Sequence, residues 1–269
     1  RTTHENSRQR QMCIRDRYIG LFDYLTEWLD KKGYNYNIIP NDTYGEPDET
    51  EEYVTPESVS SFVRSLGLPF KIRGYQLRGL YSAIKHNRRL LLSPTGSGKS
   101  LIIYSLIRWH LQYDRQVLII VPTTSLVEQL FKDFEQYGWN ARHYVNKVYA
   151  GKERYRESPV VISTWQSIYK ESRSFFNRFD VVIGDEAHLY KAKSLTKLLT
   201  KMHGCKYRIG LTGTLDGMQC HQLQLEGLFG PVEKVIRTEE LQKKGYLSEL
   251  KINVSVSYTH LTLPTSSRV

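Results

Sequence analysis

The sequence contains few cysteines and no long apolar run. Its three cysteines (Cys13, Cys205 and Cys220) are widely spaced among 269 residues and form no CxxC pair. They therefore predict neither a disulfide framework nor a zinc site, and we expect no structural metal. No segment approaches the ~20 consecutive apolar residues of a membrane-spanning helix, and the charged N-terminus has no signal-peptide core. We therefore expect a cytoplasmic protein without a membrane partner.

Acidic residues are outnumbered by basic ones. The chain has 38 Lys and Arg against 28 Asp and Glu, which gives a formal net charge of +10. This excess favours a polyanionic partner such as nucleic acid, although charge that serves only solubility is an alternative. The length suits one large or two modest domains, and an apolar fraction of 40% is enough for a packed core.

The two ends of the chain appear in the sequence as segments of a different origin from the rest. Residues 12–17 and 256–265 resemble translations, on opposite strands, of a transposon-end adapter used for sequencing libraries. We therefore expect residues 1–17 and 256–269 to be non-native segments. Disordered tails are the alternative, and the low apolar content of the first segment is compatible with them.

Between these ends the sequence predicts a small accessory segment followed by one larger domain. Residues 18–52 are interpreted as the remnant of an accessory α+β domain. Apolar side chains at helical spacing predict a helix over residues 18–33, and a short strand is expected at Tyr34–Ile39. The acidic residues 41–52 are typical of a linker. Residues 53–255 form the larger domain.

The larger domain alternates short apolar runs with helical patterns. Such Val/Ile/Leu runs between helices are typical of a mainly parallel sheet covered on both faces, so the fold class is α/β. Ligands of such sheets bind at the carboxyl ends of the strands. Strands are expected at residues 90–92, 116–121, 143–149, 160–163, 179–183, 207–211, 231–235 and 250–254, and helices at 56–66, 99–113, 124–137, 194–202, 217–228 and 238–244, with a short helix from Trp165. The stretch 68–76 is expected to lead into a further helix that runs to about Lys85.

A loop of small residues, Ser93 to Ser100, joins a predicted strand to a predicted helix. Gly96 and Gly98 allow a tight turn that aims backbone N–H groups at an anion, and the following helix start adds its own. Lys99 can reach the β- and γ-phosphates of a nucleotide, and the Ser100 hydroxyl can ligate Mg²⁺. Ser93 stands where the general pattern has glycine. An ordinary strand-to-helix turn is the alternative to a nucleotide-binding loop.

Two adjacent carboxylates, Asp185 and Glu186, follow a predicted buried strand and continue as Ala187-His188. They are expected at the same edge of the sheet as the phosphate loop. There Asp185 can hold Mg²⁺ and Glu186 can orient and deprotonate a water. Acids that only stabilise a helix start are the alternative.

The run Asp185-Glu186-Ala187-His188 resembles the DEAH form of the second motif of superfamily 2 helicases. The resemblance covers about residues 18–255 and implies that the larger domain is a RecA-like P-loop NTPase domain. Further stretches resemble the other motifs of this family in their usual order: Arg73 with Tyr75-Gln76 the Q-type motif, Val121–Gln129 motif Ia, Ile162–Ser167 the Ib/Ic region and Leu211–Thr214 motif III.

The resemblance implies ATP and Mg²⁺ as cofactors and a role for each matching residue. Catalytic roles are implied for Lys99, Asp185 and Glu186, and binding of the metal is implied for Ser100 and Asp185. His188, Thr212, Gly213 and Thr214 are implied to couple the nucleotide to the nucleic-acid site. Nucleotide contacts are implied for Arg73 and Gln76 on the adenine side and for Thr95, Gly96, Ser97, Gly98, Lys99 and Ser100 on the phosphates.

The resemblance also implies which residues meet nucleic acid. Hydroxyl and amide side chains at strand ends suit sequence-independent phosphate contacts. For Thr123 and Thr124, capping of a helix is the alternative. For Trp165 we favour packing in a core or interface over stacking on a base. The implied contacts with one strand are Pro122, Thr123, Thr124, Thr164 and Gln166.

Members of the family have a second RecA-like domain that supplies an arginine finger, and nothing after Leu228 resembles it. An arginine finger is worth on the order of 10³–10⁵ in rate. We therefore expect this chain to bind ATP, to hydrolyse it slowly and to leave duplexes unseparated. In the whole protein the resemblance implies a DNA helicase. The alternatives are a translocase that moves on duplex DNA, and a scaffold without turnover, which intact Lys99, Asp185 and Glu186 disfavour.

Overall fold

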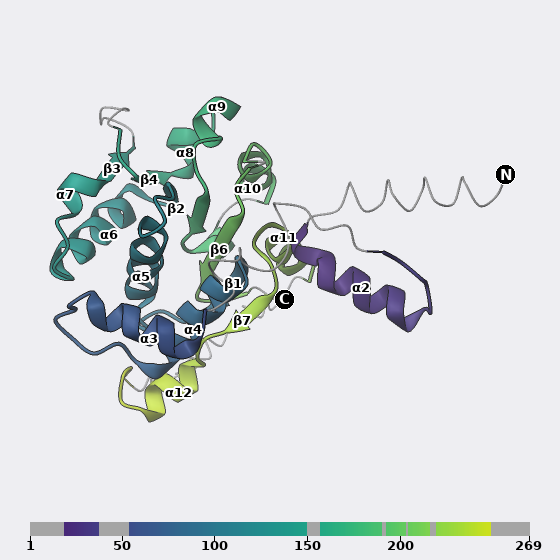
Figure 1. The fold of residues 1–269 in the computed structure, drawn as a ribbon, viewed down its shortest axis with the longest axis horizontal. Helices are drawn as coiled ribbons and strands as arrows, with labels where there is room; N and C mark the ends of the chain where they lie inside the picture. Colours follow the sequence, from purple (N-terminus) through teal and green to yellow (C-terminus); the bar gives the residue numbers. More distant parts are fainter. Residues whose placement is uncertain are drawn as a thin grey trace, which may run out of the picture.

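The centre of the molecule is a parallel β-sheet. The computed structural model describes residues 19–37, 54–149, 157–189, 192–202, 204–215 and 219–248. Its strands are β1 (Arg88–Leu92), β2 (Val117–Val121), β3 (Val145–Val148), β4 (Val160–Thr164), β5 (Val181–Gly184), β6 (Tyr207–Thr212) and β7 (Val232–Lys234). Within the described residues they form one sheet of order β3-β4-β2-β5-β6-β1-β7 (Figure 1), and every pairing in it is parallel.

Helices connect the strands and cover the sheet. Their bounds are η1 (Ile19–Leu21), α2 (Phe22–Lys31), α3 (Pro56–Ser65), α4 (Gly74–Lys85), α5 (Lys99–Leu111), α6 (Thr124–Gln136), α7 (Ala141–Tyr144), α8 (Trp165–Ile168), α9 (Arg173–Phe176), η3 (Ala187–Leu189), α10 (Ala192–Leu199), α11 (Gln219–Phe229) and α12 (Thr238–Lys243).

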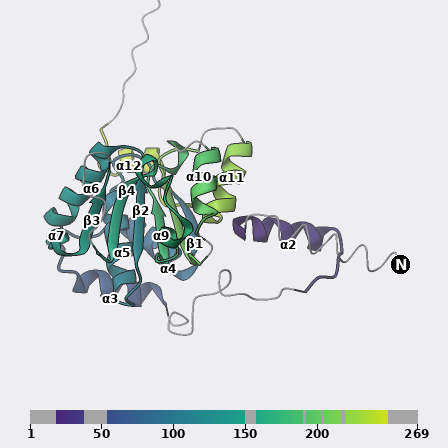
Figure 2. The same cartoon turned by 90° about the horizontal axis from the view of Figure 1, so that it is seen from above.

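Successive residues of β1, β2, β4 and β5 point into two different apolar cores. Leu91 and Ile119 pack with helices α3 to α6 and α12, whereas Leu90 and Leu118 pack on the opposite face with α8 to α11. Figures 1 and 2 show helices on both sides of the sheet. This two-period alternation is what a strand buried on both faces requires. The predicted α/β fold class is confirmed.

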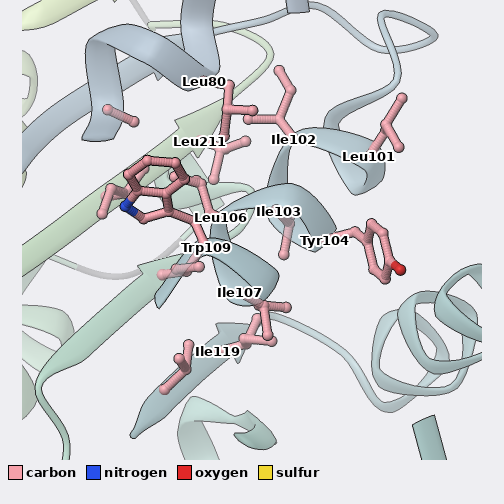
Figure 3. Packing of buried hydrophobic residues seen from close by; sticks show 14 of the residues in the cluster. Leu80, Leu101, Ile102, Ile103, Tyr104, Leu106, Ile107, Trp109, Ile119 and Leu211 are labelled. Carbon is pink, nitrogen blue, oxygen red and sulfur yellow. The ribbon is translucent and has the colours of Figure 1, made fainter. Parts of the chain in front are cut away.

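Helix α5 lies deep in the first core and fixes the phosphate loop at its start. It is apolar around most of its circumference, as expected for a helix surrounded by protein. Figure 3 shows Ile107 of α5 beside Ile119 of β2, and Ile102 of α5 close to Leu211 of β6. Because α5 is held on several sides, Lys99 and Ser100 in its first turn have a rigid support.

The N-terminal segment is a helix that contacts the sheet domain through η1. A Cβ atom at Gly20 would lie 1.9 Å from the Glu226 carbonyl oxygen, so η1 lies directly on α11. The Tyr24 hydroxyl donates to Glu226 Oε2 at 2.6 Å. From there α2 extends away from the sheet domain in both views (Figures 1 and 2). The predicted helix is confirmed.

The prediction of a strand at Tyr34–Ile39 is wrong for residues 34–37, which have no regular structure. None of the described strands pairs with these residues, and a strand without a partner leaves its backbone groups unsatisfied. Residues 38 and 39 lie outside the described part, as do 1–17, the linker 41–52, the strand expected at 250–254 and 256–269.

Two short helices differ from expectation. The helical turn α7 occupies the start of the strand expected at residues 143–149, and β3 is confined to Val145–Val148. Helix α9 was not predicted, because four residues are too few to show helical periodicity. Phe175 and Phe176 of α9 are buried in the second core, so tertiary packing stabilises this turn.

Candidate active site

The two decisive motifs meet at one edge of the sheet. Strands β1, β6 and β5 are neighbours, and their carboxyl ends carry the phosphate loop, the segment Thr212–Thr214 and the acid pair. The register places Leu92 beside Thr212, and the Ser93 N–H donates to the Thr212 carbonyl at 2.8 Å. Parallel strands thus bring residues more than 80 positions apart to one place.

The phosphate loop has the backbone that its glycines predict. Gly96 and Gly98 have φ angles of +79° and +82°, a region that other residues rarely adopt. Inside the loop the Ser97 hydroxyl donates to the Pro94 carbonyl at 2.5 Å and lies 2.7 Å from the Ser93 hydroxyl. Ser93 therefore takes part in the loop's internal hydrogen bonding, which accounts for a serine where the general pattern has glycine.

The Lys99 ammonium lies 2.7 Å from Glu186 Oε1, and their side chains are only 11% and 20% exposed. Glu186 has a φ of +49°, unusual for a residue with a Cβ atom. Its N–H donates to Asp185 Oδ1 at 3.0 Å. The loop cation and both carboxylates are thus within reach of one reacting group.

Asp185 is almost fully buried, with 5% of its surface exposed. Burial raises the pKa of its carboxyl to about 6, the negative charge of Glu186 adds to this rise, and Lys99 and the Glu186 N–H oppose it. A divalent cation would favour the charged form. Carboxylate and hydroxyl oxygens are the donors that Mg²⁺ prefers, so Asp185 and Ser100 fit a magnesium ion by chemistry.

The Ser100 hydroxyl is held by helix α6. It lies 2.7 Å from the Tyr137 hydroxyl, and the Asp133 carboxyl also hydrogen-bonds it. Burial raises the pKa of Asp133, and the Ser100 hydrogen bond opposes that rise. Asp133 and Tyr137 are not among the predicted site residues. Their four-residue spacing predicts a shared helix face, but no signal in the sequence indicates that this face meets Ser100.

The residues expected to couple the two sites form a hydrogen-bonded chain. His188 Nδ1 lies 2.8 Å from Thr212 Oγ1 and 3.5 Å from Glu186 Oε2. Thr212 Oγ1 donates to the Thr214 carbonyl at 2.6 Å, so it accepts from a proton on His188 Nδ1. Gly213 lies against the phosphate loop, since a Cβ there would be 3.6 Å from Lys99 Nζ. The structure brings this predicted set together.

Gln76, predicted to contact adenine, is buried with both ends of its amide engaged. Its Oε1 accepts from the Arg73 N–H and its Nε2 donates to the Ser97 carbonyl, each at 2.9 Å. The Tyr75 hydroxyl donates to the same carbonyl at 2.8 Å and accepts from Arg73 Nη1 at 2.9 Å. These bonds tie the start of α4 to the phosphate loop. Tyr75 belongs to the site, although it is not among the predicted nucleotide contacts.

The residues expected to contact nucleic acid lie on neighbouring strand ends. Val121 pairs with Thr164, so Pro122–Thr124 and Thr164–Gln166 share the edge of β2 and β4. Thr123, Thr124 and Gln166 are exposed there. Thr164 is buried and its hydroxyl lies 2.8 Å from the Ser167 hydroxyl.

Two side chains at this edge have structural contacts. Thr123 Oγ1 accepts from the Leu126 N–H at 3.3 Å and caps α6, so the capping alternative applies to Thr123. The partly buried Trp165 packs against the second core, as favoured for it. In the part of the chain that the structure describes, no group of three or more His, Cys, Asp or Glu could hold a metal ion. No described helix is long and apolar enough to cross a membrane.

This fold and this site define the chain as the first RecA-like domain of a superfamily 2 helicase. The family model described as "Type III restriction enzyme, res subunit" matches residues 69–217, more than half of the chain. The chain belongs to this family. The matched range includes all the motif residues from Arg73 to Thr214.

Individual relatives agree with this assignment. The chain is 32% identical over 240 residues to the ATP-dependent DNA helicase uvsW of Enterobacteria phage T4, covering 87% of this chain and 47% of that protein. It is 26% identical over 182 residues to the DNA 3'-5' translocase XPB2 of Sulfurisphaera tokodaii, covering 68% and 39%. The chain thus spans about half or less of the length of these relatives.

A solved structure shows the same architecture. The crystal structure of the UvsW helicase from Bacteriophage T4 superposes with a TM-score of 0.73 at 28% identity, covering 81% of this chain and 78% of that chain. The DEAD-box helicase Mss116 bound to ssRNA and UDP-BeF shares the fold at a TM-score of 0.52 and 17% identity. The predicted RecA-like class is confirmed.

Proposed function

We propose that this chain is the ATP-binding lobe of a motor that couples ATP hydrolysis to DNA unwinding or branch migration. One observation carries the proposal: Lys99 of the phosphate loop lies 2.7 Å from Glu186 of the acid pair, at the end of the sheet where such folds bind ligands. The similarity to a protein named as a DNA helicase supports DNA as the nucleic acid.

Each side chain of the site has a task in this proposal. The backbone N–H groups of the phosphate loop and the start of α5 hold the phosphates, and Lys99 adds a positive charge. Ser100 and Asp185 would hold Mg²⁺, whose charge offsets the charge that builds on the phosphates. Glu186 orients the attacking water and takes its proton.

The hydrogen bonds that join His188, Thr212 and Thr214 support communication between the nucleotide site and the nucleic-acid site. His188 lies near Glu186 and also bonds Thr212, the last residue of β6. A change in the charge or position of Glu186 therefore alters the contacts of His188. We propose that this relay carries the state of the nucleotide to the edge of β2 and β4, where exposed Thr124 and Gln166 grip phosphates of one strand.

A second RecA-like lobe, outside this chain, is part of the proposal and would complete the cleft and supply the arginine finger. The purified chain is then expected to bind ATP, to release phosphate very slowly and to leave duplexes intact. Robust strand separation by this chain alone would contradict the need for that lobe.

The decisive test is phosphate release by the longer protein with and without DNA. Stimulation by DNA, lost in Glu186→Gln, is the expected result. Turnover without any response to nucleic acid would overturn the motor proposal.

A duplex DNA translocase is the second candidate, because a relative over 68% of this chain is named as a DNA translocase. Both activities need the same first-lobe residues, so a mutation here does not separate them. The longer protein distinguishes them. Displacement of a third strand from a triplex, without separation of a forked duplex, would favour the translocase.

A further inference from the structure

Helix α8 leads from the edge of β2 and β4 to the end of α10. Gln166, which is exposed at that edge, lies in the first turn of α8. Tyr169 and Lys170 follow it by three and four residues, the spacing of neighbours on one helix face. The end of α10 meets this segment, because the Lys201 ammonium donates to the Tyr169 and Glu171 carbonyls, each at 2.8 Å. One surface thus connects the predicted phosphate contacts with α10.

This surface carries an excess of positive charge. Residues 165–173 and 196–201 contain a single acid, Glu171, and four cations, which we call the α8–α10 patch: Lys170, Arg173, Lys197 and Lys201. None of these cations forms an ion pair with a carboxylate of the described residues. All of them except Lys201 are exposed. The charge of the patch is therefore accessible to an anionic ligand.

Two cations of the patch lie against the same aromatic ring. Lys197 Nζ is 5.3 Å and Lys201 Nζ is 5.9 Å from the centre of the Tyr169 ring. Lys201 is partly buried and also lies 5.5 Å from the centre of the Phe176 ring. Its bonds to two carbonyls occupy donors of the ammonium but leave its charge unneutralised. Capping of α8 accounts for the position of Lys201, but not for the exposed cations of the patch.

The chemistry of the patch suits a chain of phosphates. Cations spread along a surface neutralise successive charges of a polyanion and need no contact with its bases. A strand held at Gln166 would meet the patch next, because α8 joins the two places.

We propose that the α8–α10 patch binds the sugar–phosphate backbone of the DNA strand that lies at the edge of β2 and β4. This inference rests on the proposed function, because it takes DNA as the ligand. It deepens that function by extending the path of the strand to residues outside the helicase motifs. The strand passes from the carboxyl edge of the sheet onto the face that α8 to α11 cover, where Lys170 and Lys197 contact its phosphates.

The test is the salt dependence of DNA binding, because each phosphate contact releases counterions. The whole chain is titrated with single-stranded DNA at several salt concentrations, and the logarithm of the affinity is plotted against the logarithm of the salt concentration. Lys170→Gln/Lys197→Gln removes two contacts, so the slope should become shallower by about 1.4, at about 0.7 for each contact with a single strand. The affinity should fall equally for all sequences. Lys170→Arg/Lys197→Arg keeps both charges and should behave like the original protein.

Lys243→Gln/Lys244→Gln is the matched control, because it removes the same charge from two exposed lysines at the end of α12. Figure 1 shows α12 at the opposite end of the molecule from α8 and α10. The control should keep the original slope. An equal change of slope in both double variants would overturn the inference, since net charge alone would then account for it. An unchanged slope in Lys170→Gln/Lys197→Gln would also overturn it. Failure of the proposed function gives a different result, in which the original chain itself binds no DNA at any salt concentration.

Discussion

The Lys99 ammonium and the Glu186 carboxylate form an ion pair of 2.7 Å between the phosphate loop and the acid pair. Each group compensates the charge of the other in a site that is mostly shielded from water. A triphosphate would compete with Glu186 for Lys99, because phosphate oxygens carry the larger negative charge. The same event would release Glu186 toward a water molecule, so phosphate binding and base activation are linked through one contact.

This link predicts opposite effects of Glu186→Gln on binding and on turnover. Loss of the general base should lower ATP hydrolysis about 10²–10⁴-fold. ATP affinity should stay the same or rise a few-fold, because Lys99 no longer has an anionic competitor. Phosphate release and calorimetry measure the two effects. Lys99→Ala is the comparison and should lose binding, and a large loss of ATP affinity in Glu186→Gln would contradict the competition.

The left-handed backbone conformation of Glu186 is expected to lower the stability of the folded protein. With φ at +49°, a residue with a Cβ atom is strained by about 1 kcal/mol relative to glycine. Glu186→Gly and Glu186→Ala both remove the carboxylate and its ion pair. The glycine variant should therefore be more stable than the alanine variant by about 1 kcal/mol in urea unfolding. Equal midpoints would show that the backbone carries no strain there.

The sequence predicts the elements of this molecule better than the contacts between them. The phosphate loop and the acid pair are local patterns with their own backbone chemistry, so Lys99 and Glu186 were assigned correctly to one edge of the sheet. Tyr137 was not found, because its contact with Ser100 depends on how distant elements pack. The strand expected at Tyr34–Ile39 failed over its described part for the same reason, since a strand needs a partner.

The contact between Tyr137 and Ser100 predicts a change in the dependence on Mg²⁺. The Ser100 hydroxyl lies 2.7 Å from the Tyr137 hydroxyl, a hydrogen bond that competes with ligation of a metal. Tyr137→Phe removes this competitor, and a hydrogen bond is worth about 0.5–1.5 kcal/mol. The Mg²⁺ concentration for half-maximal ATP binding should therefore fall a few-fold to about ten-fold. Ser100→Ala is the control and should raise it. A higher Mg²⁺ requirement in Tyr137→Phe would mean that Tyr137 positions Ser100 for the metal.

The buried His110 predicts a loss of stability in mild acid. Burial lowers its pKa from 6.5 to about 3, and the positive charge of Arg115, 3.2 Å away, adds to the effect. Below pH 6.5 the unfolded chain therefore binds a proton at this residue, whereas the folded protein does not. The contribution of His110 to the free energy of unfolding is thus fully present above pH 6.5 and is lost as the pH falls.

Between pH 7 and pH 5 this one group should lower the free energy of unfolding by about 2 kcal/mol. His110→Phe keeps a ring against Tyr207 but cannot titrate, so its urea midpoint should fall less over this range. The exposed His143 provides the control, and His143→Phe should follow the original protein. If the urea midpoint falls equally in the original protein and in His110→Phe, His110 does not cause the loss of stability.

Capping and phosphate contact can be separated at the edge of β2 and β4. Thr123 caps α6 through its hydroxyl, whereas Gln166 is exposed in α8. Thr123→Ala should cost about 1 kcal/mol of stability, and Thr123→Ser should keep the cap. Gln166→Ala should leave stability unchanged but weaken single-stranded DNA binding a few-fold, equally for all sequences, because a phosphate contact carries no sequence information.

Urea unfolding and DNA titration at one fixed salt concentration distinguish the two roles. If Thr123→Ala lowers stability while DNA affinity, measured well below its melting temperature, is unchanged, Thr123 serves the helix alone. Contacts with the DNA phosphates would then be made by Thr124 and Gln166. If Gln166→Ala binds DNA as well as the original protein does, this edge of the sheet is not the nucleic-acid site.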